Sequence, residues 1–272
     1  MSQKKILYVT QEILPYSDES PIADLSRHLP QAIQEKGQEI RLFMPKYGNI
    51  NERRNQLHEV IRLSGMNLII DETDHSLLIK VASIQAARMQ VYFIDSEDYF
   101  LKREVFADKD GVEYDDNDER SIFFVRGVME TIKKLRWVPD IVHVHGWFSA
   151  LAPYYIKKGY KDDPCLTNAK VIYSVYDESF EKPFKDSFAD KLRFDAIDDE
   201  EIAAVKERGE MDYVNLTKFA LDHSDGVIIG SEKIHPEIEA YIKEKGMKVL
   251  DYHEDFEENV DKINEFYESI GE

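Results

Sequence analysis

Two histidines and a tryptophan lie close together in the middle of the chain. His143, His145 and Trp147 belong to the segment PDIVHVHGW, residues 139–147, which begins as a short apolar run typical of a buried strand. Imidazole exchanges protons near neutral pH, and the carboxyl ends of strands form ligand sites in open α/β sheets. The spacing therefore predicts a ligand-binding edge at the end of this strand, with satisfied core histidines as the alternative interpretation.

The elements that must hold these side chains alternate between strand and helix patterns. Apolar runs predict strands over residues 5–10 and 40–44, and a helical period predicts a helix over 21–36 that begins at Pro21 after an N-cap at Ser20. The other expected elements are strands over 140–145, 170–175 and 226–229 and helices over 118–135, 148–158, 211–223 and 236–245. This alternation is typical of an α/β fold with a Rossmann-like, doubly wound and mostly parallel sheet.

Two regions depart from the alternation. Residues 57–94 carry extended segments with no helix between them, which predicts a β-rich insertion on the sheet. Its expected strands are residues 59–63, 67–71, 76–83 and 89–94. Towards the carboxyl terminus, residues 248–252 indicate a last strand, and residues 255–270 indicate a closing amphipathic helix with a solvated acidic face. We expect residues 1–272 to form a single domain.

The composition excludes several classes of partner. The 272 residues include 54 acidic and 35 basic ones, and the formal net charge of −19 opposes binding to nucleic acid or to an anionic membrane. Cys165 is the only cysteine, so no internal disulfide can form. The first residues form a strand pattern rather than a secretory signal, and no apolar run approaches the roughly 18 residues of a membrane span. We therefore expect a cytoplasmic protein.

Several segments, taken in order, resemble one enzyme family. Residues 4–50, 92–131, 139–156 and 171–184 are similar to the amino-terminal domain of bacterial glycogen and starch synthases, and DHSDGVIIGSEKI follows at the family's T-V-S-P strand. The third segment, PDIVHVHGWFSALAPYYI, stands where the family has P-D-V-V-H-A-H-D-W-H-x-A-L-A-P. Members of this family are retaining glycosyltransferases of the two-domain GT-B type that use ADP-glucose. The resemblance implies the amino-terminal GT-B domain.

The resemblance also implies a set of site residues on the acceptor side of a cleft. These expected substrate-binding residues are Glu12, Asp24, Tyr99, His145, Trp147 and Tyr176. Among them Asp24, Tyr99 and Trp147 are expected to face the cleft, with a core aromatic as the alternative for Trp147. Asn117 and Arg120 also match family positions, and helix-start chemistry is the alternative interpretation for this pair. No residue is assigned as catalytic, and no metal site is expected.

The departures from the family lie on the donor side. Where the family has K-T-G-G, this chain has Asp18 to Pro21, which replaces a cationic phosphate-binding turn by two carboxylates and a proline without an N–H. Like charges about 5 Å apart repel by about 3 kcal/mol at an effective dielectric near 20, which disfavours a phosphate there. Tyr176-Asp177 replaces the family's H-N pair, Gly146 and Phe148 replace the acid and second histidine of H-D-W-H, and the family's ADP-gripping second domain is expected to be absent.

These departures favour a catalytically silent module. The first hypothesis is a glycogen synthase-like domain that binds an α-1,4-glucan or a partner protein and needs no cofactor. The alternative is an active glucosyltransferase that uses ADP-glucose as donor and is completed by a second glycosyltransferase-like chain or by oligomerisation. A third role, sensing a sugar phosphate at the ligand edge, is disfavoured by the acidic pair Asp18 and Glu19.

Overall fold

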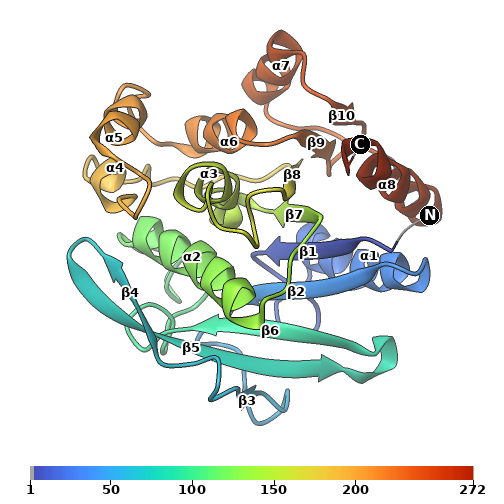
Figure 1. Ribbon diagram of the computed structural model, residues 1–272, viewed down its shortest axis with the longest axis horizontal. Helices are drawn as coiled ribbons and strands as arrows, with labels where there is room; N and C mark the ends of the chain where they lie inside the picture. The colour runs from blue at the N-terminus through green and yellow to red at the C-terminus, as the bar shows by residue number, and fades with distance from the viewer. Residues whose placement is uncertain (1–2, 272) are drawn as a thin grey trace.

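A ten-stranded sheet runs through the whole fold, which a computed structural model describes for residues 3–271 (Figure 1). The strand order is β10-β9-β8-β7-β1-β2-β6-β5-β3, with β4 paired to β5 off this path. The strands are β1 Lys5–Thr10, β2 Glu39–Pro45, β3 His58–Glu59, β4 Met66–Ile70, β5 Thr73–Ile84, β6 Met89–Asp95, β7 Ile141–His145, β8 Lys170–Val175, β9 Gly226–Ile229 and β10 Val249–Leu250. The helices are α1 Pro21–Glu35, α2 Asn117–Leu135, α3 Ala152–Tyr154, α4 Phe188–Lys191, α5 Asp199–Lys206, α6 Tyr213–Asp222, α7 Pro236–Lys245 and α8 Phe256–Gly271.

The strands from β10 to β6 are parallel to their neighbours, which confirms the predicted Rossmann-like, doubly wound fold. β1 lies between β2 and β7, and its last residue, Thr10, is in register with His145 of β7. The carboxyl ends of β1, β7 and β8 therefore meet at one edge of the sheet. α1 leads from β1 to β2, and α2 leads from β6 across to β7, so right-handed crossovers put these two helices on opposite faces.

The predicted β-rich insertion is present as antiparallel strands. β5 pairs antiparallel with β6 on one side and with β3 and β4 on the other. The strand expected over residues 59–63 is wrong in extent, because only His58–Glu59 pairs with β5. After it the chain turns, with the N–H groups of Leu63 and Ser64 both donating to the carbonyl of Val60.

The helix expected over residues 148–158 is also wrong. The chain there forms a 3₁₀ turn at Trp147–Ser149, then α3, then a five-residue π-turn at Tyr155–Gly159. Pro153 explains the break, because it has no N–H to donate one turn back. Two short helices, α4 and α5, were not expected between β8 and α6.

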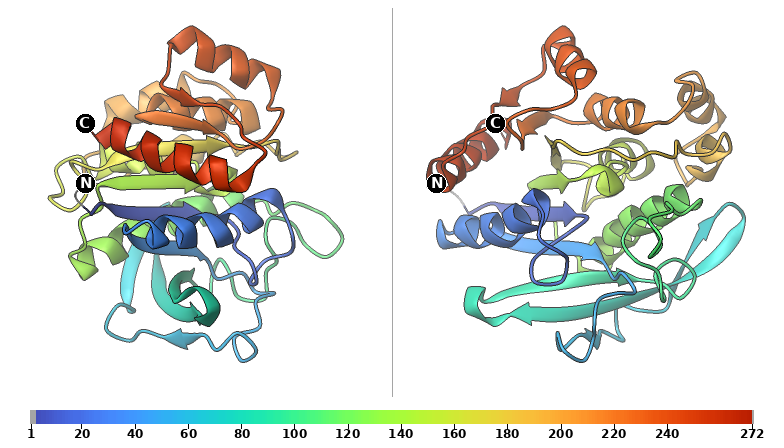
Figure 2. Two further views of the ribbon diagram at one scale, coloured as in Figure 1. Left: turned by 90° about the vertical axis from the view of Figure 1, so that its right-hand side faces the viewer. Right: turned by 180° about the vertical axis from the view of Figure 1, so that it is seen from behind.

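The closing helix α8 is present and packs beside α1 (Figure 2). Its Phe266 and Ile270 lie over Gly226 of β9, where a Cβ atom would be only 2.8 Å from the Ile270 Cδ1. Tyr267 of α8 reaches the centre of the sheet and donates its hydroxyl proton to the Tyr8 hydroxyl at 3.1 Å. Within residues 3–271, none of the helices combines the length and the apolar character that crossing a membrane requires.

Candidate functional site

A pocket of about 220 Å³ opens where β1, β7 and β8 end, and we call it the acidic pocket. It is lined by residues that follow these three strands, by the first residues of α1 and by two neighbouring loops. The lining residues are Gln11, Glu12, Ser20, Pro21, Ile22, Phe106, Trp147, Tyr176, Asp177, Glu178, Ser179 and Ser231. The described lining contains three carboxyl groups and no Lys, Arg or His side chain.

Glu178 and Gln11 tie the strand ends together inside the acidic pocket. Glu178 accepts the N–H of Trp147 on Oε1 at 2.8 Å and the side-chain amide of Gln11 on Oε2 at 3.0 Å. Gln11 in turn accepts the N–H of Phe148 at 3.0 Å. The Gln11 side chain packs so closely that a Cβ atom on Gly146 would lie 2.2 Å from it, and Gly146 also has φ +84°. Glycine is therefore required at the position where the related family has an acid.

The carboxyl groups of the acidic pocket are held in an unfavourable environment for negative charge. Burial raises the pKa of Glu178 to about 8, against the opposing hydrogen bonds from Gln11 and Trp147, and the charge of Glu12 raises it further. Burial also raises the pKa of Glu12, and Asp18 adds to that shift. The amide of Gln11 spans the two carboxyls, at 3.4 Å from Glu12 Oε2 and 3.0 Å from Glu178 Oε2. Glu178 is therefore mostly protonated at neutral pH, and an anion in the pocket would meet Glu12 and Asp177 without a compensating cation.

The two histidines lie beneath the acidic pocket and not in its lining. His145 is fully buried, its Nδ1 is 2.6 Å from the Tyr176 hydroxyl, and its Nε2 has no partner among the described residues. Burial lowers the pKa of His145 to about 3. His143 is bonded to the Tyr267 hydroxyl at 2.6 Å and to Ser174 Oγ at 2.7 Å, and burial lowers its pKa well below the ordinary value. Burial therefore favours the neutral form of both rings at physiological pH.

Three of the six predicted site residues line the acidic pocket. Glu12, Trp147 and Tyr176 come together there, and His145 contacts the lining through the Tyr176 hydroxyl and through its carbonyl, which accepts the N–H of Gln11 at 3.3 Å. Trp147 is at once a core aromatic and a wall of the pocket, because its ring packs 4.7 Å from Phe106 and retains 2% exposure. Trp147 therefore has the packing of a core aromatic and also a place in the pocket lining.

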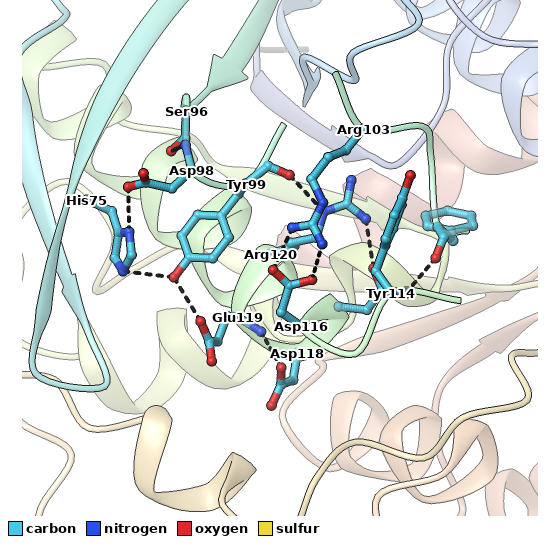
Figure 3. A network of polar contacts seen from close by, with 12 residues as sticks. His75, Ser96, Asp98, Tyr99, Arg103, Tyr114, Asp116, Asp118, Glu119 and Arg120 are labelled. Carbon is cyan, nitrogen blue, oxygen red and sulfur yellow. Dashed lines mark hydrogen bonds and ion pairs between the residues drawn. The ribbon is translucent and has the colours of Figure 1, made fainter. Parts of the chain in front are cut away.

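Asp24 and Tyr99 lie outside the acidic pocket. Asp24 is exposed on the first turn of α1, where its carboxylate is 3.2 Å from the His28 ring. Tyr99 is buried in a separate polar network, which Figure 3 shows from close by: its hydroxyl donates to Glu119 at 3.1 Å and lies 2.9 Å from His75 Nε2. The binding roles of both residues stay predictions, and the geometry separates them from Glu12 and Trp147.

Arg120 belongs to the same network and acts as a scaffold for a loop (Figure 3). Its fully buried guanidinium donates to the backbone carbonyls of Tyr99, Glu104 and Val105. It also donates to Asn117 Oδ1 at 2.7 Å. The helix-start interpretation needs correction for Asn117, because Asp116 occupies the N-cap and makes no side-chain capping bond. Arg120 instead holds the loop before α2 in place.

The segment that replaces a phosphate-binding turn forms a helix start. Ser20 is the N-cap of α1, and its hydroxyl accepts the N–H of Ala23 at 3.0 Å, as the sequence predicts. Asp18 and Glu19 are exposed beside it. Among residues 3–271 there is also no group of three or more His, Cys, Asp or Glu side chains arranged to hold a metal ion.

Gln11 and Glu178 are the residues of the acidic pocket that the sequence analysis missed. Each stands a few residues after a predicted strand, β1 for Gln11 and β8 for Glu178, which is the only local signal that either carries. Neither matches a family motif quoted above. The two residues are 167 positions apart in the sequence, and their pairing is visible only in the fold.

Comparison with known proteins finds a matching family model and several similar glycogen synthases. Residues 5–251 match the family model described as the starch synthase catalytic domain. A glycogen synthase of Pelodictyon phaeoclathratiforme is 31% identical over 243 residues, which cover 87% of this chain and 48% of the relative. A glycogen synthase of Chlorobaculum tepidum is 35% identical over 230 residues, or 84% of this chain and 46% of the relative. The chain thus spans about half the length of the relatives it matches.

A solved structure supports the same architecture. The catalytic domain of Starch Synthase IV from Arabidopsis thaliana, bound to ADP and acarbose, superposes with a TM-score of 0.71. The match covers 92% of this chain and 51% of that chain, at 17% sequence identity. At this identity the likeness is one of fold.

Proposed function

The chain belongs to the starch synthase catalytic-domain family, and from this premise we propose that it is a glycogen synthase-like glycosyltransferase domain that binds α-1,4-glucan without transferring glucose from ADP-glucose by itself. One observation carries the proposal. The acidic pocket has Glu12, Asp177 and Glu178 in its lining and no basic side chain among its described residues. A diphosphate needs positive charge for tight binding, which this lining does not supply.

The same pocket suits a neutral sugar better than a nucleotide. Carboxyl oxygens accept hydrogen bonds from hydroxyl groups, and the rings of Trp147 and Phe106 offer apolar surface for a sugar's C–H face. The volume of about 220 Å³ lies below the roughly 300 Å³ at which small-molecule sites begin, which favours one terminal sugar unit over a whole nucleotide sugar.

A site-resolved titration tests the proposal, because the chain has two tryptophans and only Trp147 lines the acidic pocket. The variant Trp137→Phe leaves Trp147 as the sole indole reporter. We expect maltotetraose to change the emission of Trp147 in a saturable way, and ADP and ADP-glucose to leave it unchanged. Calorimetry with glycogen and the same ligands provides a label-free comparison.

A matched control variant shows whether the glucan binds in the acidic pocket. Glu244→Gln removes an exposed carboxylate of α7, outside the pocket, and should leave maltotetraose binding unchanged, whereas Glu178→Gln should alter it. Equal effects of the two variants on binding would show that the glucan does not bind in the acidic pocket. Glucose transfer from ADP-glucose to glycogen by the purified protein would contradict the proposal, and transfer that needs a co-purifying glycosyltransferase-like chain would support the two-chain alternative. Binding of neither nucleotide nor glucan would favour a partner protein instead.

A further inference from the structure

A second cavity, which we call the basic pocket, lies at the opposite edge of the sheet from the acidic pocket. It has a volume of about 420 Å³ and opens at the amino ends of β2 and β6. The two strands pair only from Leu42 and Val91 onwards, so the residues before these positions diverge and leave space between them. Side chains from α1, β2, β5 and β6 surround this space. The volume falls within the usual range for small-molecule sites, roughly 300–1,000 Å³.

Two arginines supply the charge of the basic pocket. Arg41 comes from β2 and Arg88 from the turn between β5 and β6, and no carboxylate lines the cavity among the described residues. Within residues 3–271, neither guanidinium takes part in an ion pair at 4.0 Å or less. The nearest acid on the same strand, Glu39, is bonded to the indole N–H of Trp137 instead. In a chain of net charge −19, these two arginines without acidic partners give the cavity a local positive charge.

Arg41 is fixed in position and has a donor to spare. Its NH1 donates to the Tyr92 hydroxyl at 2.6 Å, and its guanidinium lies 5.6 Å from the Tyr92 ring centre and 5.2 Å from that of Trp137. Its Nε is buried without an acceptor among residues 3–271. Its NH2 makes no hydrogen bond among these residues and is not buried, so it offers a donor that a ligand oxygen can accept. A guanidinium held in this way also loses little freedom on binding a phosphate with its planar fork.

The rest of the lining is uncharged, with Ile40 and Met89 as its apolar members and Gln34, Ser83, Gln90 and Tyr92 as its polar ones. Gln34 has a buried side-chain oxygen that lacks a donor, and Ser83 and Gln90 are exposed at the mouth of the basic pocket. Such amides and hydroxyls match the hydroxyl groups of a polyol. We propose that the basic pocket binds a small phosphorylated polyol, with the phosphate on Arg41 and Arg88 and the hydroxyl groups on the uncharged side chains. This site is separate from the acidic pocket and goes beyond the function proposed for it.

The test uses three ligands of graded chemistry in calorimetry with the full chain. Glucose 6-phosphate carries both a phosphate and hydroxyls, inorganic phosphate carries only the anion, and glucose carries only the hydroxyls. We expect saturable binding of glucose 6-phosphate, weaker binding of inorganic phosphate and no binding of glucose. The variant Trp147→Phe leaves Trp137, next to Arg41, as the fluorescent reporter for the same titration. Absence of binding, or inorganic phosphate binding as tightly as the ester, would overturn the proposal.

Matched variants locate the binding. Arg88 is exposed in a turn, so Arg88→Gln keeps the fold and should weaken glucose 6-phosphate binding about tenfold, the usual effect of losing one charge-assisted contact. Arg41→Gln should weaken it further, with its melting temperature reported beside the affinity. Arg62→Gln is the control, because it removes the same charge from an exposed turn outside the cavity and should leave binding unchanged. Equal losses in Arg62→Gln and Arg88→Gln would assign the binding to overall charge and contradict the site.

Discussion

The two edges of one parallel sheet carry opposite charge. At the carboxyl edge, the acidic pocket presents three carboxyl groups and no cation in its described lining, and at the amino edge the basic pocket presents two arginines and no carboxylate. The net charge of −19 does not reveal this difference between the two pockets. The contrast teaches that a site selects the charge of its ligand through the charged groups within about a Debye length, roughly 10 Å at 0.1 M salt. The net charge of the whole protein matters less.

The edges also differ in how their polar groups are satisfied. In the acidic pocket, Gln11 and Glu178 bond each other and the backbone of Trp147 and Phe148, so the strand ends are closed. In the basic pocket, Arg41 keeps an unused donor. Binding at the carboxyl edge must therefore compete with existing bonds, whereas binding at the amino edge completes one.

The largest expected effect comes from breaking the carboxyl edge at its glycine. Gly146→Ala puts a Cβ atom 2.2 Å from the Gln11 side chain at φ +84°, and should cost more than about 3 kcal/mol of unfolding free energy. Gly111→Ala is the matched control, because Gly111 has φ +81° with nothing within 4 Å of the added atom, and should cost about 1 kcal/mol. Urea denaturation measures both. Similar losses would show that the close packing of Gln11 contributes little.

A smaller effect concerns the charge of Glu178. Its pKa is raised from 4.5 in the unfolded chain to about 8, so the folded protein binds more protons and its stability should fall as pH rises through that interval. In Glu178→Gln, stability should fall less steeply, so that the loss between pH 6.5 and 8 is smaller by on the order of 2 kcal/mol. The slope is the readout, because a glutamine amide would face the Gln11 amide and change the absolute stability as well. An unchanged slope would mean that Glu178 is ionised and solvated.

The smallest expected effect is an absence of titration at the two histidines. Burial lowers the pKa of His145 to about 3 and that of His143 well below its ordinary value, so their ring signals in NMR should not move between pH 5 and 8. Their contribution to stability is lost only as pH falls below 6.5, which leaves the Glu178 interval above it undisturbed. A midpoint between pH 5 and 7 for His145 would put a cation beneath the acidic pocket and weaken the contrast between the edges.

Local patterns in the sequence predict the central fold well. The strands β1, β8 and β9 and the helix α7 have the expected bounds, because a continuous apolar run or a capped helical period fixes each of them locally. The region after Trp147 does not follow its helical period, since Pro153 removes a backbone donor and the turn is decided by packing. The short helices α4 and α5 lack the length at which periodicity is distinctive.

The candidate sites are less predictable than the fold. Glu12, Trp147 and Tyr176 are found together because each follows a strand or matches a motif, whereas Gln11 and Glu178 meet only through the fold. The basic pocket gives no local signal, because Arg41, Arg88 and Gln34 come from three separate elements. The binding roles of Glu12, Asp24, Tyr99, His145, Trp147 and Tyr176 stay predictions.

The bond between Tyr267 and Tyr8 sets an order of events during synthesis. These residues are 259 positions apart, and Tyr267 also bonds the Nδ1 of His143 in the centre of the sheet. A ribosome releases the strands β1 and β7 long before it releases α8. Until α8 emerges, the buried hydroxyl of Tyr8 and the Nδ1 of His143 lack their native partner. The growing chain therefore holds an incomplete core until α8 has emerged, and the docking of α8 completes the side-chain hydrogen bonds of Tyr8 and His143.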